Sequence, residues 1–370
     1  MTALGTDTGT SKGTLARVTR EDLKDIATGA AILGTGGGGD PYVGRLLADV
    51  ALAQHGPVRI TPLGELPDDA VVVAVGVIGA PTIGLEKIQG AEEVTDAVKA
   101  LDAVLPDPVT HIVCTEIGGG NSMVPIVAAA RLGLPLVDAD GMGRAFPELQ
   151  MLTPGLLDIS ATPLGLADEK GNTLVLRSPQ NNWAEHIARA VAVSMGCTAS
   201  YAMYPMAGAD ARAAYIPGTL SWAHRLGRLH RRSRGDHRDV PAVIAAELDG
   251  RVVFSGKVAG VDRRTVGGFV RGRAVLSGAG DPAERFEIDF QNENLVARHG
   301  GRIVATVPDL ICVVDSDGGA PITTENLGYG MRASVLVAPS DPRWRTERGL
   351  ALVGPRYFGY DLDYVPFEQR

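Results

Sequence analysis

Residues 111–151 have the sequence HIVCTEIGGGNSMVPIVAAARLGLPLVDADGMGRAFPELQM. An apolar strand, a glycine loop, a small apolar helix, a second apolar strand and a second glycine loop follow one another, which predicts one βαβ unit. The strands are expected at His111–Cys114 and Leu134–Val137, and the helix at Met123–Leu132, ending before Gly133. Nearly all such units are right-handed with both strands in one sheet, and ligands of parallel sheets bind outside the carboxyl ends of the strands. The two polar loops should therefore face one crevice.

These two loops supply most of the candidate site residues. Carboxylates crowded in one crevice cannot all stay ionised, so the acids there are expected to divide the roles of general acid and general base. An arginine among them would hold a substrate carboxylate or keep a neighbouring acid charged, while an asparagine and the loop amides would bind carbonyl groups. Taken singly, each acid is equally well explained as a helix cap, and only the set favours a site. The candidates are Glu116, Asp138 and Asp140 as catalytic acids, and Gly119, Gly120, Asn121, Arg144 and Glu148 as binding residues.

A second glycine loop, GTGGGGD at residues 34–40, precedes this unit. It formally matches G-x-G-x-x-G, but a helix rather than a strand is expected before it and no Lys-Ser/Thr pair follows, so nucleotide binding is rejected. Asp40 and Pro41 predict the cap and first turn of the next helix. The loop is either a sharp turn between helices or a run of backbone amides that meets a ligand. The amides expected to meet it belong to Gly36, Gly37 and Gly38.

The rest of the pattern predicts an α/β amino-terminal domain with a largely parallel sheet, followed by a β-rich carboxyl-terminal domain. Ala70–Ile78 is an unbroken apolar run typical of a covered strand, and Leu85–Leu105 has helical spacing. Short β-rich runs, from Ala242–Leu248 to Ala333–Val337, dominate the second half. We therefore expect a flexible tail at residues 1–18, an α/β domain at 19–180 and a β-rich domain at 181–370.

Composition limits the classes of function. The chain has 370 residues, a net charge of −8 and three cysteines, Cys114, Cys197 and Cys312, without metal-type spacing. The acidic balance argues against nucleic-acid and membrane-surface binding, and the odd cysteine count favours a reducing, cytoplasmic location. The basic run at residues 225–238 is interpreted as a solvated helix end. Exposed edges in the β-rich domain favour a homo-oligomer, and the expected partner in the crevice is a small-molecule substrate.

Several long motifs resemble one known family over nearly the whole chain. They are AILGTGGGGDPYVG (31–44), TEIGGGN (115–121), VDADGMGRAFPELQM (137–151), SGKVAGVDRRTVGGFVRG (255–272), DSDGGAPITTENLGYG (315–330) and GPRYFGYD (354–361). The sequence is similar in these segments to the S-methyl thiohydantoin desulfurase family, formerly a family of unknown function encoded near hydantoinases. The resemblance implies a two-domain hydrolase that cleaves the exocyclic C–S bond of an S-methyl thiohydantoin, giving a hydantoin and methanethiol.

The residues suit that chemistry, with alternatives left open. An S-methyl thiohydantoin is a cyclic isothiourea whose C2 becomes electrophilic when a ring nitrogen is protonated, so an acid, a base for water and a dry pocket are needed. In a covalent alternative, the Cys114 thiolate attacks C2, although a cysteine closing an apolar strand is more often a buried hydrophobe. In a metal-dependent alternative, Asp138, Asp140 and Glu148 hold a divalent ion such as zinc, although the seven histidines show no paired spacing.

A last alternative is a non-catalytic subunit that binds hydantoin-like ligands or a hydantoinase partner. The segment at 315–330 would then be an interaction loop, or it would reach the crevice of the first domain. Its polar candidates are Asp315, Asp317, Glu325 and Tyr329.

Overall fold

The computed structural model describes residues 14–79, 90–266 and 269–370. The βαβ unit is present, with β4 (His111–Cys114) and β5 (Leu136–Asp140) paired in parallel and joined by α5 (Val124–Leu132). The helix ends at Gly133, whose φ of 67° lies in the left-handed region that favours glycine.

The second strand runs further than expected. The sequence pattern ended it at Val137, but Asp138 and Asp140 lie within β5, where Ala139 and Asp140 pair with the short strand β9 (Ile216–Pro217). The prediction that both acids belong to the loop beyond the strand was wrong, because pairing of Asp138 with Pro62 of β2 and of Asp140 with Cys114 of β4 and Ile216 of β9 extends the strand over polar residues.

A mixed sheet organises the first half of the molecule. Its centre is four parallel strands in the order β2 (Val58–Pro62), β5, β4 and β3 (Val71–Gly79). β1 (Arg17–Val18) adds antiparallel to β2 at one end. The predicted α/β class with parallel strands is confirmed.

The other end of this sheet is antiparallel. β8 (Thr198–Ala207) pairs with β3 on one side and with β6 (Leu164–Ala167) on the other, and β7 (Thr173–Leu176) completes a hairpin with β6. β8 follows the predicted domain boundary at residue 180, as do α6 (Asn181–Ser194), α7 (Gly208–Ala214) and α8 (Thr219–Gly235).

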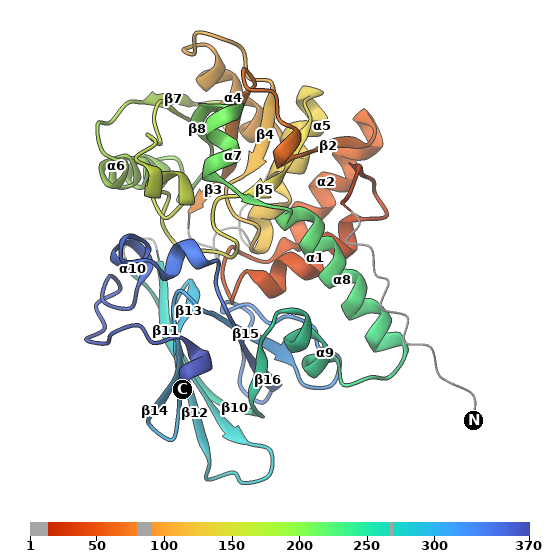
Figure 1. The fold of residues 1–370 in the computed structure, drawn as a ribbon, viewed down its shortest axis with the longest axis vertical. Helices are drawn as coiled ribbons and strands as arrows, with labels where there is room; N and C mark the ends of the chain where they lie inside the picture. Colours follow the sequence, from red (N-terminus) through yellow and green to blue (C-terminus); the bar gives the residue numbers. More distant parts are fainter. Residues whose placement is uncertain (1–13, 80–89, 267–268) are drawn as a thin grey trace.

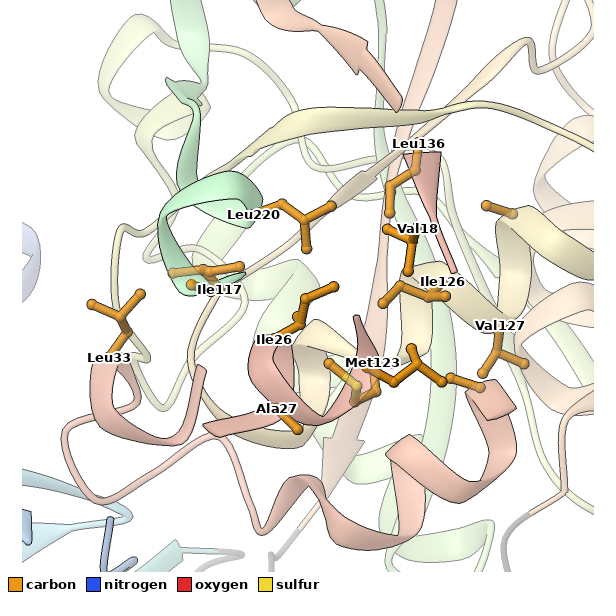
Figure 2. Close-up of a cluster of buried hydrophobic side chains, with 14 of the residues drawn as sticks. Val18, Ile26, Ala27, Leu33, Ile117, Met123, Ile126, Val127, Leu136 and Leu220 are labelled. Atoms are coloured by element: carbon orange, nitrogen blue, oxygen red, sulfur yellow. The ribbon is translucent and has the colours of Figure 1, made fainter. Parts of the chain in front are cut away.

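Helices cover both faces of the mixed sheet. One face packs on α1 (Leu23–Leu33), α2 (Pro41–His55), α4 (Glu92–Asp102), α5 and α8. Figure 2 shows Ile26, Met123, Ile126 and Leu136 pointing toward one another in this cluster. α2 begins at Pro41 with Asp40 as its cap, which accepts a hydrogen bond from the Tyr42 amide (2.8 Å), as the sequence predicted.

The second half contains one antiparallel sheet in the order β14-β13-β12-β11-β10-β16-β15, which confirms the β-rich class. Its strands are β10 (Arg251–Val266), β11 (Phe269–Gly278), β12 (Arg285–Gln291), β13 (Glu293–His299), β14 (Arg302–Thr306), β15 (Leu310–Asp315) and β16 (Arg332–Ala338). A last helix, α10 (Glu347–Val353), follows them.

One predicted strand is a helix. Ala242–Leu248 lies largely in α9 (Val240–Glu247), which Asp239 caps by accepting a hydrogen bond from the Ala242 amide (3.1 Å). A short apolar run has no clear period, and here the cap and Pro241 in the first turn favour the helix.

The two sheets lie one above the other in Figure 1, with α1, α8 and α9 beside the junction. Buried side chains of α1, α8 and α9 share a cluster with Leu310, Cys312 and Leu336 of the second sheet. This cluster therefore spans the junction of the two halves, while a separate hydrophobic cluster lies within the second half. Residues 1–13 of the predicted tail and residues 85–89 of the predicted helix lie outside the described residues. Among the helices that are described, none combines the length and apolarity needed to span a membrane.

Candidate active site

A cavity of about 260 Å³ opens at the carboxyl ends of β3 and β4. Its walls come from the glycine loop and α2, from the loops after β4 and β5, from the start of β8 and from the turn before β13. We call this space the site cavity. Its apolar wall includes Leu47, Ile78, Val94, Val124, Val127, Phe146 and Leu149. Its acidic wall consists, among the described residues, of Asp40, Glu93, Glu116, Glu148, Asp168, Glu169 and Glu293.

Glu116 reaches the site cavity from the loop after β4. The side-chain amide of Asn121 donates a hydrogen bond to its Oε1 (2.6 Å), and the same amide is fixed on the backbone of Val77, whose N–H donates to Asn121 Oδ1 (2.8 Å). Glu116 Oε2 is buried and has no hydrogen-bond partner in the described part of the chain. Glu116 therefore presents one oriented carboxyl group whose second oxygen lacks a well-formed hydrogen bond, although the backbone amide of Phe146 is close enough to lower its pKa.

Glu293 reaches the same cavity from the second sheet. It is the first residue of β13, follows Asn292 in a tight turn, and is only 2% exposed. Its Oε1 accepts a long hydrogen bond from the Gly38 amide (3.3 Å), and its Oε2, like that of Glu116, lacks a described partner. The cavity thus holds two buried carboxyl groups from two different sheets.

Burial and nearby charges shift the pKa of both members of this pair. Burial first, and then the charge of Glu293, raises the pKa of Glu116 well above its ordinary value. Burial also raises the pKa of Glu293 to about 8, against the opposing effect of the Arg144 charge. These surroundings favour the protonated form of both acids, and Glu293 ionises as the pH rises through about 8.

Arg144 lies behind the cavity rather than in it. It is fully buried, and its guanidinium donates hydrogen bonds to the carbonyls of Pro308 (2.7 Å) and Asp309 (2.9 Å) and to the Thr35 hydroxyl (2.7 Å). Burial lowers its pKa to about 10, opposed by the charge of Glu293. This buried position does not suit the predicted role of holding a substrate carboxylate, and the effect of Arg144 on a neighbouring acid is to oppose the burial that raises the pKa of Glu293.

The glycine loop joins the two sheets. The Thr35 carbonyl accepts from the Asn294 amide (2.8 Å), and the Gly36 carbonyl accepts from the Thr324 amide (2.8 Å). A Cβ at Gly37 would lie 2.0 Å from Glu293 Oε1, so only glycine lets Glu293 approach this closely. Gly38 lines the site cavity, whereas Gly36 and Gly37 form its outer support.

The loop after β4 packs directly on the glycine loop. The Gly120 amide donates to the carbonyls of Gly38 and Gly39 (both 2.9 Å), and a Cβ at Gly119 would lie 2.5 Å from the carbonyl carbon of Gly38. The structure therefore brings together the glycine loop at residues 34–40 and the glycines of the loop after β4. Gly120 and Asn121 line the cavity, and Gly119 lies behind them.

Asp140 ties two loops together at the edge of the sheet. Its Oδ2 accepts from the amides of Ile117 (2.9 Å), Met142 (2.9 Å) and Gly143 (2.8 Å). Burial raises its pKa to about 7, although these three hydrogen bonds oppose the shift. Asp140 does not line the site cavity, and its contacts position the loop that carries Glu116.

Asp138 faces α8 instead of the cavity. Its carboxylate accepts from the Ser221 amide (3.0 Å) and the Ser221 hydroxyl (2.6 Å), and its backbone carbonyl accepts from the Gly218 amide (2.8 Å). These contacts satisfy amides at the amino terminus of the helix, as a capping side chain does. The helix-cap alternative accounts for this residue.

Cys114 ends β4 with its side chain fully buried and outside the cavity lining. Burial raises the pKa of its thiol well above the ordinary value, and the charges of Asp140, Asp138 and Glu116 raise it further. A thiol in these surroundings stays protonated and is a poor nucleophile.

Glu148 lines the outer part of the cavity and accepts a hydrogen bond from the Tyr357 hydroxyl (2.6 Å). The segment at 315–330 reaches the glycine loop, where Asn326 donates to Asp40 Oδ2 (2.9 Å) and both oxygens of Glu325 are buried without a described partner. Tyr329 in the same segment is 80% exposed.

Within residues 14–79, 90–266 and 269–370, no three His, Cys, Asp or Glu side chains are grouped as metal ligands. Asp138, Asp140 and Glu148, the sequence-predicted candidates, point in three directions: to α8, to the loops beside β5 and to Tyr357.

The sequence reasoning missed Glu293. The polar run Gln291-Asn292-Glu293-Asn294 interrupts two apolar strands, and such an interruption was the available signal. All four of these residues are buried.

Two family models and a solved structure match this chain over nearly its whole length. A family model described as S-Me-THD-like, N-terminal domain, matches residues 21–178, and a second, S-Me-THD-like, C-terminal domain, matches residues 179–367. A crystal structure of a protein from Chromobacterium violaceum is similar with a TM-score of 0.79 and 26% sequence identity, over 95% of this chain and 99% of that one. No curated protein matches the chain.

Proposed function

This chain belongs to the S-Me-THD-like family along both of its halves, and we propose that it is a hydrolase acting on S-methyl thiohydantoins. Water and the substrate would give a hydantoin and methanethiol. One observation carries the proposal: Glu116 and Glu293 place two buried carboxyl groups on one cavity, each with an oxygen that lacks a partner among the described residues.

The reacting group of this substrate complements such a pair. The N–C(SCH3)–N unit is a cyclic isothiourea that, once protonated, offers an N–H on each side of C2. Two carboxyl oxygens without partners are acceptors for two such donors, and a buried acceptor left unpaired is costly. The free oxygens of Glu116 and Glu293 are therefore the proposed contacts of the ring nitrogens and of the attacking water.

In the first step, protonated Glu116 gives its proton to the ring nitrogen while ionised Glu293 takes a proton from water. The water oxygen forms a bond to C2 as the C2–N double bond opens, giving a tetrahedral intermediate. Arg144 supports this assignment, because its charge favours the ionised form of Glu293.

In the second step, the C2–S bond breaks. Glu293 gives its new proton to the leaving sulfur, Glu116 recovers a proton from the C2 hydroxyl, and the C2 carbonyl forms. Both residues return to their starting states, so the cycle needs no further reactant. Asn121 holds Glu116 in place through both steps, since it donates to Glu116 Oε1 while bound to Val77.

The apolar wall of the cavity supplies the remaining requirement. Ile78, Val124 and Phe146 line the cavity together with the two acids. A water-poor pocket strengthens the electrostatic effect of each carboxyl group on the developing charge.

The proposal is tested by incubating the purified protein with an S-methyl thiohydantoin and measuring free thiol and hydantoin together. We expect both products in equal amounts. Saturable binding of the compound without release of thiol, across the pH range in which the protein is folded, would instead support the non-catalytic alternative.

The proposed setting is a reducing, cytoplasmic compartment, with the protein acting on a small molecule as a symmetric homo-oligomer. Tyr42, Leu46 and Val50 support association, because they form an exposed apolar stripe at helical spacing on α2. Light scattering at micromolar concentration tests this, and a monomer would contradict it.

A further inference from the structure

Acidic side chains dominate the part of the cavity wall that residues 14–79, 90–266 and 269–370 provide. Seven acidic side chains line it, and Arg189 is the one lysine or arginine among its described lining residues. Arg189 is already engaged: it forms an ion pair with Glu185, donates to the Pro147 carbonyl (2.9 Å), and stacks over the Phe269 ring at 4.3 Å. The described wall therefore offers no unengaged cation to a bound anion.

A second observation points to a ligand at this acidic wall. Glu116 and Glu293 line the cavity while only 4% and 2% exposed, and each has a buried carboxyl oxygen without a hydrogen-bond partner in the described part of the chain. These two oxygens take the reacting N–C(SCH3)–N unit in the proposed function. Of the other acids on the described wall, Glu93 and Glu148 are the two that we assign to the ring substituent.

We infer that the site selects its substrates by charge, accepting thiohydantoins whose ring substituent is neutral or cationic and rejecting those whose substituent carries a carboxylate. This inference rests on the proposed function and names its substrate class. It follows that thiohydantoins related to neutral or basic amino acids are substrates, and those related to aspartate or glutamate are not.

The physical reason is desolvation without compensation. A substituent carboxylate entering the cavity loses water and meets like charges in a medium of reduced dielectric constant, where unit charges several ångströms apart still repel strongly. An amide of the same shape loses less hydration energy and can donate hydrogen bonds to the acids. Like-charge repulsion of this kind is also weakened by salt where the cavity is open to solvent.

The test uses two hydantoins of the same shape, one with a 2-carbamoylethyl and the other with a 2-carboxyethyl substituent at ring position 5. Their affinities for the intact protein are measured by calorimetry at low and high salt, and kcat/KM is measured for the two S-methyl thiohydantoins. We expect the amide to bind at least about tenfold tighter, with the ratio shrinking at high salt and with the same order in kcat/KM.

Neutralising the cavity acids that face the substituent should reduce the preference for the amide over the carboxylate. Glu93→Gln and Glu148→Gln should each reduce the ratio severalfold, whereas Glu65→Gln, at an exposed position outside the cavity, should leave it unchanged. Equal or tighter binding of the carboxylate overturns the charge selection alone. Binding of neither hydantoin, together with no thiol release, overturns the charge selection and the proposed function together.

Discussion

Glu293 lies close enough to Glu116 for its charge to raise the pKa of Glu116, although one begins β13 of the antiparallel sheet and the other follows β4 of the mixed sheet. Neither sheet alone contains the pair. The glycine loop makes the approach feasible, because Gly37 has no side chain at the point where Glu293 Oε1 passes. The proposed chemistry is thus a property of the junction between the sheets.

Replacing either acid by its amide should stop the reaction while the protein stays folded. Glu116→Gln and Glu293→Gln keep the shape but remove proton transfer, so turnover should fall by roughly a hundredfold or more. The rate of thiol release measures this loss of turnover. Glu287→Gln is the matched control, since Glu287 lies on the neighbouring strand β12 outside the cavity. Full activity in both cavity variants would remove the carboxylate mechanism.

The activity should rise with pH before it falls. The reactive form has Glu293 ionised and Glu116 protonated, and the pKa of Glu293 is raised to about 8. We expect the ascending limb of kcat/KM near pH 8, titrating as a property of the coupled pair. The residual kcat/KM of Glu293→Gln should show no such rise with pH. A profile that is flat between pH 6 and 9 in the wild type would contradict the assignment.

Stability should depend on pH in the opposite direction. The pKa of Glu293 is about 8 in the folded protein and near the ordinary 4.5 in the unfolded chain, so the folded state binds more protons between these values. The contribution is complete below about pH 4.5 and is lost as pH rises through 8. Denaturant unfolding at pH 5 and pH 8.5 should show a decline of at least about 1 kcal/mol that is smaller in Glu293→Gln. An equal decline in that variant would assign the effect to other groups.

Gly37→Ala should damage the site more than the fold. The added Cβ would lie 2.0 Å from Glu293 Oε1 and 2.5 Å from its Cδ, so the carboxyl group must move. We expect turnover to fall at least about tenfold, as misplaced catalytic groups cause, with a smaller change in thermal midpoint. Gly64→Ala is the control, because a Cβ there meets nothing within 4 Å. Normal kinetics in Gly37→Ala would show that Glu293 need not occupy this position.

Cys114→Ser separates the covalent route from the carboxylate route. The thiol is buried outside the cavity, and burial raises its pKa, so we expect turnover within about threefold of wild type. Cys312→Ser, at another buried position, controls for the cost of placing a hydroxyl there. If turnover disappears in a folded Cys114→Ser protein and persists in Cys312→Ser, the thiolate mechanism replaces the one proposed here.

The local part of this site could be predicted from the sequence. The βαβ unit has strong periodicity and a glycine stop at Gly133, so its elements, and the placing of Glu116 and Asn121 at a strand end, followed from residues close together in the chain. The loop at residues 34–40 meets this unit through the hydrogen bonds that the Gly120 amide donates to Gly38 and Gly39.

The rest of the site could not be predicted from the sequence, because it depends on contacts between distant segments of the chain. Asp138 and Asp140 had the composition of a site, but pairing with β9 and the amino terminus of α8 determine where their oxygens point. Glu293 had no local signal beyond a polar interruption of two strands, because its significance arises only when the second sheet meets the glycine loop. Sequence periodicity reports which face of an element is buried and not which other element covers it.

The placement of β8 has a consequence for dividing this protein into pieces. A fragment ending at residue 178 would carry β3 with a bare edge, and its β6–β7 hairpin would have lost the only strand through which it joins the sheet in the described chain. Exposed strand edges recruit other strands, so such a fragment is an aggregation hazard when made alone. The complementary fragment would hold β8 without its sheet and Glu293 without Glu116. Co-expression of the two fragments is therefore the useful form of a split protein, and recovery of the proposed thiol release would report their reassembly.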